Sequence, residues 1–197
     1  MKNNYSPIII SGPSGAGKTE LIDYLETKDE NFMDAPGVTT RAKRNKEKGN
    51  LKFVSLNEFK ELIEQEKLIQ YTKYNNNYYG TLKSSLRLLQ NKQLLFNIGL
   101  EGAIKIKRLC PTSKLIYILP PNKEEIIKRM GDRGIERYEL GIRQTMQSID
   151  LYDYLLVSYT NELEYVYEDF MNIYENKDES KSLKLIKNQN FMKNFYK

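Results

Sequence analysis

The sequence contains no histidine among its 197 residues. This absence excludes a histidine general base, a histidine-based catalytic triad and a histidine metal site. A single cysteine, Cys110, excludes an internal disulfide bond and a cysteine metal cluster, and it suits a reducing compartment. Any chemistry must therefore use other side chains.

Long apolar runs are also missing. No stretch approaches the ~18 apolar residues that cross a membrane, and the first residues, MKNNYSP, lack the apolar segment of a signal peptide. We therefore expect a cytoplasmic protein with no membrane partner. A hydrophobic content of 40% and a charged content of 29% are ordinary for a globular protein. The length suits one α/β core with an insertion.

The net charge of +5 is concentrated at the C-terminus. Residues 177–197 hold six lysines but only two acidic residues, so the rest of the chain is about neutral. Such a tail is either a solvated or loosely docked terminus, or an arm that binds nucleic acid. We favour the first interpretation and expect no nucleic-acid partner.

Residues 8–19, IIISGPSGAGKT, combine a β-branched run with a glycine-rich turn. They match the phosphate-loop pattern G-x-x-x-x-G-K-[ST], in which glycines let backbone N–H groups face a phosphate chain. Lys18 would neutralise phosphate charge and Thr19 would offer a hydroxyl to Mg²⁺. A chance turn is disfavoured by the strand before it and the helix after it. The expected ATP-binding residues of the loop are Gly12, Pro13, Ser14, Gly15, Ala16, Gly17, Lys18 and Thr19.

Strand-like and helix-like segments alternate along the chain, which predicts an α/β fold with a parallel sheet and a ligand at the carboxyl ends of its strands. The expected strands are 8–10, 94–98, 115–119 and 155–157, and the expected helices are 17–25, 103–109, 123–130 and 161–174. Asn122 and Glu125 are expected to cap one helix. Residues 37–79 differ in character and predict a small β-rich insertion with a hairpin turn at Asn75–Asn77.

Several further motifs follow in a specific order: TTRAKR, FVSLNEF, NYYGT and PPNKEEIIKRMGDRG. Together with the phosphate loop, they resemble the guanylate kinase family from about residue 8 to about residue 174. The resemblance implies a P-loop NTPase-type parallel sheet core with an inserted nucleoside-monophosphate (NMP)-binding subdomain and a helical lid. It also implies transfer of the γ-phosphoryl group from ATP to GMP or dGMP with Mg²⁺. The expected divisions are a core at 1–36 and 82–176, a lid at about 122–146, a subdomain at 37–81 and a basic tail at 177–197.

The resemblance also implies roles for single residues. Arg41, Arg44 and Tyr79 match groups that hold the acceptor phosphate, and Gln70 and Thr81 fall at the acceptor base. Among the lid arginines, Arg129 is expected to contact ATP, while Arg133 and Arg143 are expected to act with Lys18 in catalysis. The alternatives are a solvated basic loop for Arg41 and Arg44, surface helix charge for the lid arginines, and a sheet aromatic for Tyr79.

Five positions depart from the family pattern: Gly37, Leu51, Gln70, Asn97 and Gly99. Gln70 stands where the family has a glutamate that reads guanine, and an amide offers one acceptor and one donor where a carboxylate offers two acceptors. Because adenine fits an amide at least as well, we expect looser base selection. The alternatives to GMP phosphorylation are a kinase for another phosphorylated acceptor and a weakly catalytic protein-binding domain. We expect the protein to be a monomer or a homodimer.

Overall fold

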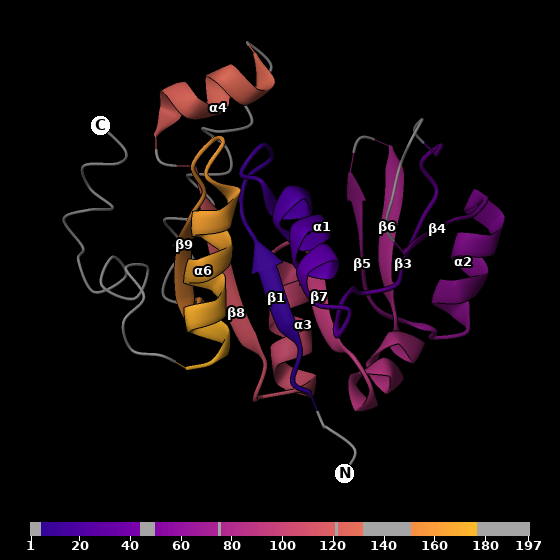
Figure 1. The fold of residues 1–197 in the computed structure, drawn as a ribbon. Coiled ribbons are helices and arrows are strands. Elements are labelled where there is room, and N and C mark those ends of the chain that lie inside the picture. Colours follow the sequence, from indigo (N-terminus) through magenta and orange to yellow (C-terminus); the bar gives the residue numbers. More distant parts are fainter. Residues whose placement is uncertain (1–4, 44–49, 75, 121, 132–150, 177–197) are drawn as a thin grey trace.

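The computed structural model describes residues 5–43, 50–74, 76–120, 122–131 and 151–176. In these residues the strands form two sheets, drawn in Figure 1. The first has the order β2-β7-β1-β8-β9 and the second has the order β4-β3-β6-β5.

All neighbouring strands of the first sheet are parallel. The strands are β1 (Ile8–Ser11), β2 (Phe32–Asp34), β7 (Gln93–Asn97), β8 (Lys114–Leu119) and β9 (Tyr154–Val157). Helices α1 (Lys18–Lys28) and α6 (Leu163–Tyr174) cover one face, while α3 (Leu100–Leu109) covers the other (Figure 1). The α/β fold with a parallel core is therefore confirmed.

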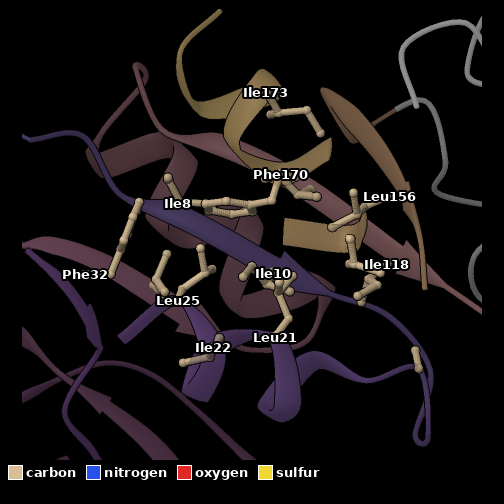
Figure 2. Packing of buried hydrophobic residues seen from close by; sticks show 14 residues of the cluster. Ile8, Ile10, Leu21, Ile22, Leu25, Phe32, Ile118, Leu156, Phe170 and Ile173 are labelled. Atoms are coloured by element: carbon tan, nitrogen blue, oxygen red, sulfur yellow. The ribbon is translucent and has the colours of Figure 1, made fainter. Parts of the chain in front are cut away.

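The core between the first sheet, α1 and α6 explains why these segments fold as they do. Ile8 and Ile10 of β1 point toward Leu25 of α1 and Phe170 of α6, and all four are at least 98% buried (Figure 2). A strand covered on both faces is apolar throughout, and β1 is buried along its whole length. This packing holds the start of α1, and thus the phosphate loop, in place.

The sequence did not predict two elements. Phe32–Asp34 forms β2, a core strand before β7, and Lys83–Gln90 forms the 3₁₀ helix η1. Three residues are too few to carry a recognisable alternation, and a 3₁₀ helix has a different period from an α-helix. β2 lies beside β7 because Met33 pairs with Leu94, a contact that depends on the fold of the whole sheet.

The second sheet contains β3 (Gly37–Thr39), β4 (Leu51–Phe53), β5 (Leu68–Tyr74) and β6 (Asn77–Leu82). β5 and β6 are antiparallel, as the turn chemistry predicts, and Asn76 has the positive φ of 60° that a tight turn requires. Helix α2 (Leu56–Glu64) packs on one side of this sheet through Phe59, which is fully buried. The opposite side carries the paired residues Gln70 and Thr81.

Helix α4 (Lys123–Met130) lies beyond the carboxyl ends of the parallel strands (Figure 1). Its first turn is capped by Asn122, whose side-chain oxygen accepts from the backbone N–H of Glu125 at 2.9 Å, as predicted. In the described part of the chain, no helix is long and apolar enough to cross a membrane.

Candidate active site

The phosphate loop connects β1 to α1 through glycines that no other residue replaces easily. A Cβ at Gly12 would lie 2.2 Å from the Ile118 carbonyl oxygen, and one at Gly17 would lie 2.8 Å from Ser158 Oγ. Both glycines have positive φ angles, 150° and 89°. The loop is therefore closely packed against the ends of neighbouring strands, and its backbone shape is determined there.

Lys18 begins helix α1 and folds back over the loop. Its Nζ donates to the carbonyl oxygens of Gly12 and Pro13, both at 2.8 Å. Burial lowers the pKa of Lys18 to about 8, because a buried ammonium loses hydration. The side chain is still mostly charged at neutral pH, next to a helix N-terminus that attracts anions.

A cavity of about 330 Å³ lies in front of the loop and is lined by Gly15, Gly17, Lys18, Thr19, Glu20 and Arg129. Asn97, at the end of β7, donates through Nδ2 to Thr19 Oγ1 at 3.3 Å. Parallel strands end at one edge of the sheet, so these polar groups meet although 78 residues separate them in the sequence. Thr19 is therefore a solvent-facing oxygen donor in a cavity with two cations.

Arg129 lies in this cavity and not on an open helix surface. Its Nη1 donates to Gly15 O and Ser158 Oγ, both at 3.2 Å, and Nη2 donates to Ser158 O at 2.9 Å. Its Nε donates to Thr160 Oγ1 at 2.9 Å. Sequence reasoning missed Ser158 and Thr160. The available signal was their position directly after β9, at the same sheet edge as the phosphate loop.

The second sheet brings together three residues that the sequence predicted for the acceptor. Gln70 pairs with Thr81 across β5 and β6, and Tyr79 lies two residues from Thr81, so all three share one face of the sheet. Gln70 Nε2 donates to Thr81 Oγ1 at 3.0 Å, and both side chains are buried. The opposite face holds Tyr78 and packs on α2.

Gln70 also contacts the first sheet's helix α3. A Cβ at Gly102 would lie 2.9 Å from Gln70 Cδ, so the absence of a side chain there makes room for the amide. Helix α3 begins three residues after Asn97, which contacts Thr19. The face bearing Gln70 and the phosphate loop thus converge on the junction between β7 and α3.

Arg41 lies beyond the end of β3, next to that face. Its guanidinium carbon is 5.3 Å from the centre of the Phe53 ring, a cation–π contact, and its backbone N–H donates to Thr39 Oγ1 at 3.2 Å. Thr39 in turn donates to Tyr78 O at 2.8 Å. Arg41 is therefore held by β3 and β4, and through Thr39 it is linked to β6. Arg44, Arg133 and Arg143 lie outside the described residues.

The family model described as guanylate kinase matches residues 4–177. This chain belongs to the guanylate kinase family. It is 34% identical over 160 residues to guanylate kinase of Hydrogenovibrio crunogenus, covering 76% of this chain and 78% of that protein. It is 38% identical over 143 residues to guanylate kinase of Prochlorococcus marinus, covering 71% of this chain and 78% of that protein.

A solved structure supports the same assignment. The crystal structure of guanylate kinase from Anaplasma phagocytophilum matches with a TM-score of 0.67 and 25% identity, covering 95% of this chain and 94% of that chain. The fold of this chain thus resembles that of a guanylate kinase over nearly the whole of the solved structure. The family assignment expected from the motifs is confirmed.

Proposed function

We propose that this chain is a nucleoside-monophosphate kinase that transfers the γ-phosphoryl group of ATP to GMP or dGMP. The observation that carries the proposal is membership of the guanylate kinase family together with a complete phosphate loop around Lys18. Relatives that match most of the chain are named guanylate kinases, which favours an enzyme over a protein-binding domain.

The donor half of the proposed reaction uses the cavity in front of α1. Lys18 exchanges its two carbonyl partners for β- and γ-phosphate oxygens, and the charge that develops during transfer is stabilised without covalent chemistry. Arg129, in the same cavity, adds a second positive charge. Because lysine and arginine supply the charge, the proposed transfer needs no histidine.

The donor set in the cavity fits Mg²⁺ that enters with the triphosphate. In the described residues no group of three carboxylate, histidine or cysteine side chains is arranged to hold a metal ion unaided. Thr19 offers a hard hydroxyl oxygen, and phosphate oxygens and water complete a shell of the type that Mg²⁺ prefers. Bound there, Mg²⁺ would withdraw negative charge from the transferring phosphoryl group.

The acceptor half uses the polar face of the second sheet. Arg41 and Tyr79 bind the monophosphate, and Gln70 with Thr81 faces the base; from the family resemblance, Arg44 joins Arg41. The family resemblance likewise assigns Arg133 and Arg143 to the lid, from which they approach the transferring phosphoryl group. The subdomain at 37–81 and the lid at about 122–146 remain the proposed divisions. Charge-assisted pairing with the phosphate does not depend on the base, whereas Gln70 affects base selection.

The test is an ATP-consumption assay with GMP, dGMP, AMP, IMP and dTMP as acceptors, using wild-type protein and Lys18→Met. We expect transfer to GMP and dGMP in the wild type, with slower transfer to another purine monophosphate. Lys18→Met should lose at least about 100-fold in kcat. Transfer to no monophosphate by a folded wild-type protein that binds ATP would contradict the proposal.

A further inference from the structure

Arg129 ties together three segments that are distant in the sequence. From helix α4 it donates to the phosphate loop at Gly15 and to the residues after β9, Ser158 and Thr160. Its side chain is only 16% exposed. An arginine has five N–H donors, and these bonds use four of them. The guanidinium is therefore committed to one orientation at the wall of the donor cavity.

Glu125, one helical turn earlier on α4, places its carboxylate beside the Arg129 guanidinium. Its Oε1 is buried and has no hydrogen-bond partner in the described part of the chain. The cation facing that oxygen is Arg129, with Nε at 3.6 Å. Lys128 Nζ lies 3.9 Å from Oε2, but that lysine is 75% exposed and its charge is screened by water. A buried carboxylate oxygen without a hydrogen bond lowers stability.

The carboxylate of Glu125 acts on the orientation of the Arg129 guanidinium. Nε already donates to Thr160, so the carboxylate biases the plane of the guanidinium and does not add a further hydrogen bond. That plane directs Nη1 to the Gly15 carbonyl in the loop. Met130 contributes on the same side, because a Cβ at Gly15 would lie 2.4 Å from its sulfur. Helix α4 thus supports the loop from outside.

We propose that Glu125 is a positioning residue, whose carboxylate holds Arg129 against the phosphate loop and so pre-forms the donor site. The inference rests on the proposed function for its ligand, a nucleoside polyphosphate at the loop. A loop held in its binding conformation loses less entropy when the phosphates bind. Removing the charge of Glu125 should therefore weaken binding of the donor nucleotide and leave binding of the acceptor unchanged.

The test compares Glu125→Gln with Glu124→Gln. Both substitutions remove one negative charge from the first turn of α4, so their effects on net charge and helix dipole match. Glu124 is exposed and contributes to no ion pair that involves Arg129. Calorimetry gives the Kd for ADP with Mg²⁺, steady-state kinetics gives KM for ATP and for GMP, and thermal unfolding gives Tm.

We expect Glu125→Gln to raise the Kd for ADP and the KM for ATP by about fivefold over Glu124→Gln. The KM for GMP should equal that of the control, and the Tm should not fall below that of the control, because the buried carboxylate oxygen does not itself stabilise the fold. In an Arg129→Met background, Glu125→Gln should change the Kd for ADP by less than about twofold, because the residue acts through Arg129.

Three results would overturn the inference: equal Kd values for the two glutamine variants, a fivefold effect that persists in the Arg129→Met background, or a fall in Tm together with a rise in the KM for GMP. A wild-type protein that binds ADP but phosphorylates no monophosphate would refute the proposed function alone, because the Kd comparison still decides the role of Glu125. A wild-type protein that does not bind ADP overturns both.

Discussion

At the scale of single residues, Lys18 carries a charge that the proposed chemistry needs and that burial opposes. Its ammonium is held by two backbone carbonyls of its own loop, and its pKa is lowered to about 8 because burial removes water. Bound phosphates would favour the charged form and raise this pKa again. Nucleotide binding and protonation of Lys18 are therefore linked.

This linkage predicts the pH dependence of ADP binding. Well below pH 8 Lys18 is mostly protonated in the free protein, so it gives little pH dependence there. Above pH 8 the free protein must take up a proton on binding, and affinity should fall by up to about tenfold per pH unit. Calorimetry between pH 7 and 9.5 measures it, with Lys18→Met as the control that should bind weakly and show no such fall. A flat wild-type profile would contradict the prediction.

Gln70 is the second residue whose chemistry can be tested singly. In Gln70→Glu, Thr81 would donate its hydroxyl proton to the new carboxylate, which keeps acceptor capacity for the guanine N–H donors. The ratio of kcat/KM for GMP to that for AMP should rise by about tenfold, within the ~1–3 kcal/mol that one hydrogen-bonding group contributes to selectivity.

The matched control for Gln70→Glu is Gln65→Glu, which makes the same change at an exposed position after α2. If both variants keep the wild-type GMP to AMP ratio, then Gln70 does not face the base and another residue selects it.

At the scale of elements, α2 shows that a motif shared with a family can serve the fold rather than the substrate. Ser55, in FVSLNEF, accepts from the Glu58 N–H at 3.2 Å, and Glu58 Oε2 accepts from the Ser55 N–H at 2.7 Å. This reciprocal capping box satisfies two backbone donors at the helix start. It fixes where α2 begins and how Phe59 enters the second sheet's core.

We therefore expect Ser55→Ala to lower the free energy of unfolding by about 1 kcal/mol while the KM values for ATP and GMP stay unchanged. Urea unfolding and steady-state kinetics measure the two effects. Ser84→Ala is the control, since Ser84 is exposed on η1 and caps no helix. A large rise in the KM for GMP with unaltered stability would instead place Ser55 at the substrate.

At the scale of the whole molecule, the connection between the two sheets contains a carboxyl group, that of Asp34, whose pKa is raised. Asp34 ends β2 of the first sheet, and β3 of the second begins three residues later. Burial and the nearby Glu26 and Asp23 raise the pKa of Asp34 to about 7. Its backbone carbonyl accepts from Asn50 Nδ2 at 2.9 Å, which links it to the start of β4.

Because the pKa of Asp34 is higher in the folded chain, the folded state keeps a proton that the unfolded state loses. Stability should fall as pH rises from about 4 to about 7 and then stay constant for this group. Asp34→Asn removes this loss, so above pH 7 it should be about 1–3 kcal/mol more stable than wild type, after allowance for partial exposure.

Urea unfolding from pH 4 to pH 8.5 measures the difference between the two proteins. Glu30→Gln, the same loss of charge at an exposed position before β2, should show a small offset that does not vary over this range. If the Asp34→Asn and wild-type curves run parallel, the carboxyl group ionises normally in the folded protein.

The sequence alone determined the features that a few adjacent residues encode. The phosphate loop, the cap at Asn122 and the apolar strands of the core depend on local backbone chemistry and on burial of both faces of a strand, so their patterns are visible in the chain. The order of motifs also predicted the family. The residues expected at the acceptor could be named, but not their contacts.

Only the tertiary structure decided which distant groups meet. Thr19 meets Asn97, Arg129 meets Ser158, and Gln70 meets Gly102 of α3. The strand order β2-β7-β1-β8-β9 places segments from the whole chain at one edge, and no local pattern specifies that order. The same holds for β2, which is a strand because β7 offers it hydrogen-bond partners, and for the buried oxygen of Glu125, whose environment exists only once α4 rests on the phosphate loop.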